Sequence, residues 1–245
     1  MDGRARGRAS GHPWRVVVRV AALGLAAGAA GADRLAAQVG YDPGHSPYRD
    51  IVGGGAVVLA AGYLGGGRGQ TGVGMSNGAT GSARFELPLG HTVSVSFNLA
   101  SARTSRFLID PTKDSLTRKS GPIRTSVSLA DVGLQLLLTG GKTWHRLAPF
   151  VGGSLGLALG GNPTTDASGY HFGTTFQFAP SAGVRWYPTR RLSVRTDFRL
   201  VFWKLTYPLS FKQPGPDGSR VLSVDASDTE WTKHPWISVG LGWTF

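Results

Sequence analysis

Hydrophobic and polar residues alternate along most of the chain after residue 50. In residues 92–99, for example, every second residue is large and apolar, and the residues between are Ser, Thr or Asn. Such alternation places successive side chains on opposite faces of a β-strand. Similar runs predict eight strands, at residues 51–64, 80–89, 92–99, 125–138, 147–159, 172–186, 192–202 and 237–245. A change of phase near Ala130 is interpreted as a β-bulge.

The lengths of these strands and connections indicate a membrane barrel. Most of the predicted strands have 10 to 15 residues, whereas strands of globular proteins usually have about five or six. Short turns near residues 88–90, 139–142 and 187–190 alternate with long polar loops at 65–78, 101–123, 160–171 and 206–233. This layout predicts an all-β fold: an eight-stranded antiparallel up-and-down transmembrane β-barrel with short periplasmic turns and long extracellular loops. Alternation alone also allows a soluble barrel of the lipocalin type, with the aromatic face inside.

The first residues have the pattern of an export signal. Five arginines in residues 1–19 precede a short run of small and apolar residues that ends near Ala32. A basic segment, a short apolar segment and small residues before a cleavage site define a secretory signal peptide. We expect residues 1–37 to be this signal, cut near residue 32 or 37, residues 38–50 to be a periplasmic lead-in, and residues 51–245 to be the barrel.

Composition narrows the function classes. The chain has 37 Gly, no Cys and a net charge of +12. Without cysteine it has neither a disulfide nor a thiolate metal site. Cleavage after residue 37 removes six basic and two acidic residues, so the charge falls to (26−6)−(14−2) = +8. We therefore expect no nucleic-acid partner for this exported chain.

The end of the chain resembles that of a known family. Every second residue from Ile237 to Phe245 is apolar, with Phe last: Ile237, Val239, Leu241, Trp243 and Phe245. This pattern resembles the C-terminal insertion signal of bacterial outer-membrane β-barrels, and residues 183–199 resemble the late hairpin of OmpA/OmpX-like eight-stranded barrels. The resemblance implies a location in the bacterial outer membrane and recognition by the barrel assembly machinery.

One face of the predicted strands carries charges. Four arginines and three acids share the face opposite the apolar one: Arg84, Glu86, Asp131, Arg185, Arg195, Asp197 and Arg199. An eight-stranded barrel is just wide enough for side chains to fill it, and buried charges must be paired or hydrated. A salt-bridged plug is the favoured interpretation, with a narrow pore for small solutes as the alternative.

The loop predicted at 101–123 is basic. On the cell surface its cations could bind lipopolysaccharide phosphates: Arg103, Arg106, Lys113, Arg118 and Lys119. A merely solvated loop is the other interpretation. We expect outer-membrane lipid and lipopolysaccharide as partners, and a monomer.

Catalytic motifs are weak in this sequence. The only histidines with an acid nearby in sequence at the long loops are His171, near Asp166, and His234, near Asp228. An outer-membrane enzyme acting on lipid A or peptides is thus an alternative to a structural or surface-interaction protein. We expect no enzyme activity, no cofactor and no metal site.

Overall fold

Eight long strands form a closed barrel. The computed structural model describes residues 46–161, 166 and 168–245, and Pro47–Phe245 form one compact unit. The strands in these ranges are β2 (Ala56–Leu64), β3 (Ser76–Pro88), β4 (Val93–Ile109), β5 (Lys119–Leu137), β7 (Leu147–Gly160), β8 (Gly173–Trp186), β9 (Leu192–Thr206) and β10 (Thr229–Thr244). Each pairs antiparallel with the next, and β10 pairs with β2. The predicted fold is therefore confirmed.

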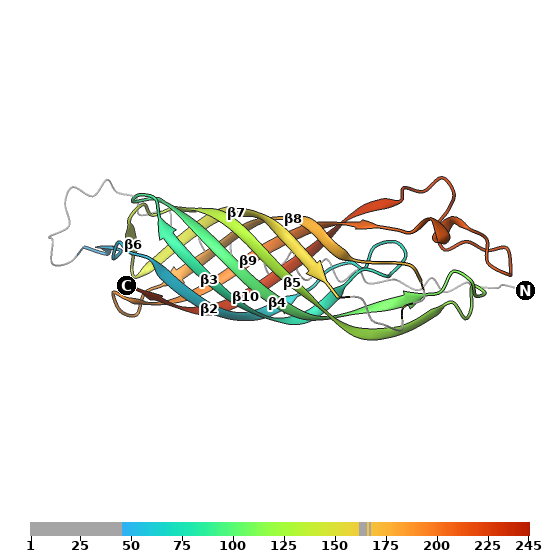
Figure 1. Ribbon diagram of the computed structural model, residues 1–245. Coiled ribbons are helices and arrows are strands. Elements are labelled where there is room, and N and C mark those ends of the chain that lie inside the picture. The colour runs from blue at the N-terminus through green and yellow to red at the C-terminus, as the bar shows by residue number, and fades with distance from the viewer. Residues whose placement is uncertain (1–45, 162–165, 167) are drawn as a thin grey trace, which may run out of the picture. The chain divides into compact units, whose positions relative to one another are not determined.

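The strands slant across the barrel axis, and their hairpins extend far beyond the barrel wall at one end (Figure 1). Ring closure pairs Trp236 with Leu64 at one end of the seam and Thr244 with Ala56 at the other. Closure leaves no unpaired edge, as a sheet in lipid requires. Among the described residues, no helix has the length and apolar character to cross a membrane.

Two short strands lie at the end with the short turns. β1 (Tyr48–Asp50) pairs antiparallel with β6 (Lys142–Trp144), which leads directly into β7. The last residues of the predicted lead-in therefore contact the barrel at its periplasmic end. The predicted signal peptide at 1–37 lies outside the described residues.

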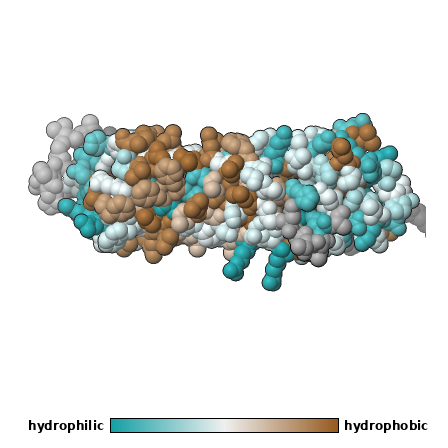
Figure 2. Space-filling view, viewed as in Figure 1, coloured by the Kyte–Doolittle hydropathy of each residue, from teal (hydrophilic) through white to brown (hydrophobic). Residues whose placement is uncertain are grey.

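The outer wall carries a band of exposed apolar side chains. Figure 2 shows this band around one half of the barrel, with hydrophilic residues over the other half. Every second residue of β10 contributes to it, from Ile237 to Trp243, all more than half exposed. Since exposed apolar area on this scale is unfavourable in water, the alternation places hydrocarbon outside the barrel, and the soluble interpretation does not hold.

The apolar side chains change face along β5 without any break in the strand. Val127 and Leu129 are buried in the interior, whereas Val132, Leu134 and Leu136 are exposed on the wall. The pairing of β5 with β4 and β7 is continuous through this region. The bulge predicted near Ala130 is therefore wrong. Where the strand passes from water into lipid, its apolar side chains move from the inner face to the outer face, and this produces the same change of phase in the sequence as a bulge. The register shift of this hairpin lies between Arg106 and Leu108.

Several boundaries differ from those predicted. β4 continues to Ile109 and β5 begins at Lys119, so the connection predicted at 101–123 shortens to residues 110–118. β10 likewise begins at Thr229. Phe172, just before β8, is buried in the interior and packs on Trp203. Beyond the lipid band the outward residues are polar, so the alternation that marks a membrane strand is lost there.

Candidate functional site in the barrel lumen

Four strands position the charged residues inside the barrel. Arg84 and Glu86 lie on β3, Asp131 on β5, Arg185 on β8, and Arg195, Asp197 and Arg199 on β9. All seven side chains point inward, and each residue is at most 9% exposed. Strand periodicity explains this placement, because residues two apart share a face.

Arg195 is at the centre of the network. Its guanidinium donates two hydrogen bonds to Asp197, at 2.6 and 2.7 Å, and one to Glu86 on β3, at 2.5 Å. Arg84 donates to Asp197 at 3.1 Å. Two-pronged arginine–carboxylate pairs are among the strongest charged hydrogen bonds, so these contacts tie β3 to β9 across the lumen.

Glu86 receives a further cation from β8. A guanidinium nitrogen of Arg185 lies 3.0 Å from a carboxylate oxygen of Glu86, and Arg185 also donates to Gln135 of β5 at 2.5 Å. The Phe150 ring of β7 is a third neighbour, because the guanidinium carbons of Arg195 and Arg185 lie 4.0 and 5.3 Å from its centroid. Cations over an aromatic face are stabilised when desolvated.

A second group of contacts surrounds Asp131. Arg199 forms an ion pair with it at 2.9 Å, and Asn98 and Gln177 donate side-chain amide hydrogen bonds at 3.1 and 3.3 Å. Arg199 also donates to Ser154 and lies over the Trp236 ring. The seven charged residues carry a net charge of 4−3 = +1, and each is paired with a residue of opposite charge in the network.

Sequence reasoning missed the uncharged members of this site. Asn98 and Phe150 also lie on inward faces, and their strand positions could have identified them, since Val151 and Leu99 beside them face lipid. The predicted cluster contained charged residues alone, although the alternation already put amides such as Asn98 on the same face. Asn98 donates a hydrogen bond to Asp131, and the Phe150 ring covers the guanidinium groups of Arg185 and Arg195.

An apolar cluster fills the extracellular half of the interior. Trp203 and Val201 of β9, Trp236 of β10 and Leu129 of β5 are almost fully buried in it. Side chains from the connections join them, among them Met75, Tyr170, Phe211 and Leu222. The interior is thus charged over its periplasmic part and apolar above.

The two histidines considered for catalysis lie in different environments. His234 is buried, stacks on Trp203 with ring centroids 3.7 Å apart, and has Thr232 and the Gly65 carbonyl as hydrogen-bond partners. His171 is exposed. Asp166 pairs with Arg106, and Asp228 pairs with Lys212. The structure therefore does not bring either predicted acid to His234, and the described residues contain no cluster of three metal-ligating side chains.

Two of the predicted lipopolysaccharide contacts are buried. Arg106 is fully buried, pairs with Asp166 and lies over the Tyr170 ring, and Arg118 pairs with Asp217 and Ser219. Both side chains are buried by contacts with residues of this chain, so their prediction as surface contacts is wrong. Arg103 and Lys119 on the strands and Lys113 in the loop are exposed.

The ion pairs Arg106–Asp166 and Arg118–Asp217 join the extracellular connections into a cap. Burial disfavours ionisation of Asp166, but hydrogen bonds from Ser168 and Arg106 outweigh it and lower the pKa of its carboxyl. The pKa of Asp217 is also lowered, because Ser219 and the Ser115 backbone donate to its carboxylate. Asp217 thus links residues 207–228 to the β4–β5 connection.

Three features together identify the fold: a ring of eight strands, a lipid-facing apolar wall and a filled interior. The fold is that of an eight-stranded outer-membrane β-barrel. The five residues of the resembled insertion signal, Ile237 to Phe245 at every second position, lie on the lipid-facing wall.

Solved outer-membrane barrels are similar to this chain. Neisserial surface protein A is 11% identical over 78% of this chain and 97% of its own, with a TM-score of 0.48. OprG from Pseudomonas aeruginosa is 12% identical over 80% and 99%, with a TM-score of 0.49. Ail, the attachment invasion locus protein of Yersinia pestis, is 10% identical over 79% and 100%, with a TM-score of 0.39. No protein-family model and no curated protein matches the sequence.

Proposed function

We propose that this barrel has a structural and surface-interaction role without catalysis, and that its charged network is a plug that closes the lumen. The observation that carries the proposal is the contact of Arg195 on β9, which is also paired with Asp197 of the same strand, with Glu86 on β3, because it spans the lumen between two strands that are not neighbours in the ring. A barrel of eight strands has room for little besides its own side chains. An ion crossing this lumen would have to separate buried ion pairs, which is costly.

The apolar cluster supports closure independently. Water and ions that passed the charged network would meet Trp203, Trp236 and Leu129, all at most 2% exposed. A mostly apolar region offers few hydrogen bonds to replace those of a hydrated ion. Two barriers of different chemistry therefore lie in series along the barrel axis.

Planar-bilayer recording tests the plug against the pore alternative. We expect no single-channel conductance from the purified mature protein, whose folding is verified by its heat-modifiable mobility on gels. Because the two barriers lie in series, Arg195→Gly combined with Glu86→Gly is expected to stay silent, and to conduct only when Trp203→Gly and Trp236→Gly open the apolar cluster as well. Regular channel openings from the unaltered barrel would instead support a narrow pore.

Contact with lipopolysaccharide is the proposed surface interaction. Arg103 on β4 and Arg124 on β5 are both exposed on the outer wall. Arg103 pairs with Ser126 in register, and Arg124 lies two residues from Ser126, so the two cations are diagonal neighbours, with Cα atoms about 7–8 Å apart. Two guanidinium groups on adjacent strands are able to donate together to one phosphate.

A shallow groove on the wall adjoins this pair of arginines. It has a volume of about 460 Å³ and is lined by small and apolar side chains: Gly81, Ala83, Leu99, Ala130 and Leu159. Ser101 and Ser128 line its polar edge and pair with each other in register. The next outward-facing pair along the two strands is Arg103 and Ser126. An acylated, phosphorylated lipid fits a surface with apolar and cationic parts side by side.

Retention of lipopolysaccharide tests this part of the proposal. The barrel is extracted in a mild neutral detergent, and bound lipid A is measured by native mass spectrometry. We expect Arg103→Gln combined with Arg124→Gln to lower retention at least about tenfold, because each change removes one charged hydrogen-bond donor. Arg191→Gln, an exposed arginine at the periplasmic end, is the control and should retain lipid A. Equal retention by the double variant and the unaltered barrel would contradict the proposal.

A further inference from the structure

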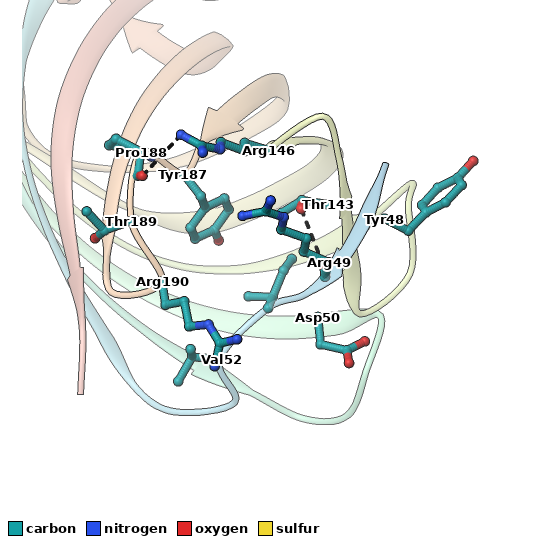
Figure 3. A pocket seen from close by; sticks show the side chains of 11 residues that line it. Tyr48, Arg49, Asp50, Val52, Thr143, Arg146, Tyr187, Pro188, Thr189 and Arg190 are labelled. Atoms are coloured by element: carbon teal, nitrogen blue, oxygen red, sulfur yellow. Dashed lines mark hydrogen bonds between the residues drawn. The ribbon is translucent and has the colours of Figure 1, made fainter. Parts of the chain in front are cut away.

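A large open cavity lies at the periplasmic mouth of the barrel. Its volume is about 730 Å³, and its lining includes three arginines: Arg49, Arg146 and Arg190. In Figure 3 the Arg49 side chain reaches the middle of this space beside the Tyr187 ring, while Arg146 and Arg190 approach it from two other sides. None of the seven charged residues of the network lines the cavity, and Tyr187 is the lining residue that interacts with one of them, Arg195.

Three segments far apart in sequence build this cavity. Residues 48–52 form one wall, the β6–β7 turn forms the second, and the β8–β9 turn forms the third. Backbone hydrogen bonds hold them together: His145 donates to Pro47, Ile51 to Gly141, and Tyr187 to Arg146, at 3.0, 3.0 and 2.8 Å. In addition, the Thr143 hydroxyl donates to the Arg49 carbonyl. The segment before the barrel is therefore a structural part of this mouth.

The turn that carries Arg146 has an unusual backbone. His145 and Arg146 join β6 to β7, and their φ angles are 48° and 66°. A two-residue hairpin turn with two positive φ values favours Asn-Gly, because a Cβ is disfavoured in the left-handed region. An arginine kept there in spite of this cost points to a role for its side chain. Its guanidinium is 3.5 Å from the Pro188 carbonyl of the third wall.

The charges of the cavity are not balanced. Among the described residues, Arg49, Arg146 and Arg190 form no ion pair, in contrast to the seven charged residues of the lumen. Asp50 is the one acid in the lining, and its carboxylate is turned away from the arginines (Figure 3). Thr143, Thr189 and Tyr187 add hydroxyl groups. Guanidinium groups with free donors and nearby hydroxyls match the acceptor oxygens of carboxylates and phosphates.

We propose that this cavity is a binding site for a periplasmic ligand that carries two or more carboxylate or phosphate groups. Three cations on separate walls suit an anion with several separated charges, since one small anion reaches fewer of them. The Tyr187 ring supplies an apolar surface for the body of such a ligand. The three arginines of the site belong neither to the plug nor to the proposed lipopolysaccharide contact, so loss of ligand binding and loss of either of those functions are distinguishable outcomes.

Calorimetric titration with two probes tests the site. The mature protein in neutral detergent micelles at low salt is titrated with citrate and, separately, with pyrophosphate. We expect saturable binding of about one ligand per chain, weakened by added salt. The probe that binds more tightly identifies carboxylates or phosphates as the natural groups. No saturable binding of either probe would overturn the proposal.

Matched arginine variants localise the binding. Arg49→Gln and Arg190→Gln should each weaken binding about tenfold, because each removes a charged hydrogen-bond donor. Arg191→Gln removes the same charge from the same turn outside the lining, and it should change binding less than about twofold. Arg190→Lys keeps the charge without the planar fork and should give an intermediate loss. An effect of Arg191→Gln as large as that of Arg190→Gln would mean unspecific attraction and overturn the site.

Discussion

Arg195 on β9 and Glu86 on β3 are joined across the lumen by a hydrogen bond of 2.5 Å between Nη1 and Oε1. Both side chains are almost completely buried. Glu86 also has Arg185 at 3.0 Å and Arg84 at 3.9 Å. One carboxylate therefore compensates three guanidinium groups from β3, β8 and β9.

Removing the charge of Glu86 should destabilise the barrel strongly. Glu86→Gln raises the net charge of the seven-residue network from 4−3 = +1 to 4−2 = +2, and breaking a buried pair costs about 3–5 kcal/mol. Urea unfolding of the protein in lipid vesicles measures this loss. Asp225→Asn is the control, because Asp225 is exposed, and it should change stability by less than about 0.5 kcal/mol. Similar unfolding midpoints for both variants would contradict the structural role of Glu86.

The charged network was predictable because its members share the strand period. Arg84 and Glu86 are two residues apart, as are Arg195, Asp197 and Arg199, so a strand puts each group on one face. Which charges meet was not predictable, since Glu86 and Arg195 are 109 residues apart and only the barrel geometry brings them together.

The extracellular ends of the strands were predicted less well. Along β4, outward Phe97 and Leu99 give way to Ser101 and Arg103, while inward Asn98 is followed by Ala100 and Ala102. The polar residues thus change faces where the strand leaves lipid, and the alternation signal fails there. Arg106 was assigned to a basic loop for this reason, and its partner Asp166 lies 60 residues away.

Single cysteines should locate this membrane boundary on β5. The chain has no cysteine of its own, so each introduced thiol is the sole target of a membrane-impermeant maleimide. Ser126→Cys faces outward beyond the apolar band and should be labelled on intact cells, whereas Val132→Cys and Leu134→Cys face lipid and should not. Val127→Cys is buried in the interior and is the second protected control. Labelling of Val132→Cys on intact cells would mean that the lipid band has been placed at the wrong height.

The left-handed turn at Arg146 should favour glycine over alanine. Both Arg146→Gly and Arg146→Ala remove the guanidinium, but only glycine adopts φ near 66° without a Cβ penalty. The glycine variant should therefore be more stable than the alanine variant by about 1–2 kcal/mol, measured by urea unfolding in vesicles. Citrate binding should be weakened equally in the two variants. Equal stability would mean that the backbone of this turn relaxes once arginine is removed.

The extracellular cap should loosen in acid. The pKa of Asp217 is lowered in the folded protein by hydrogen bonds from Ser219 and Ser115. A carboxyl with a lowered pKa contributes stability above the ordinary pKa of about 3.9 and loses that contribution as pH falls through its folded value. Protonation weakens its contact with Arg118, 3.5 Å away, and so releases the β4–β5 connection from residues 207–228.

Spin-label mobility measures this loosening. A label at Leu116→Cys, a residue 95% exposed in that connection, should be restrained at neutral pH and become mobile only well below about pH 3.9, as the pH falls through the lowered pKa of Asp217. With Asp217→Asn added, the label should already be mobile at neutral pH, since an amide lacks the charge that attracts Arg118. A label at Ser126→Cys on β5 is the control and should not respond, because the strand pairing there does not titrate. A label at Leu116 that is as restrained with Asp217→Asn as without it at neutral pH would show that Asp217 does not hold the cap.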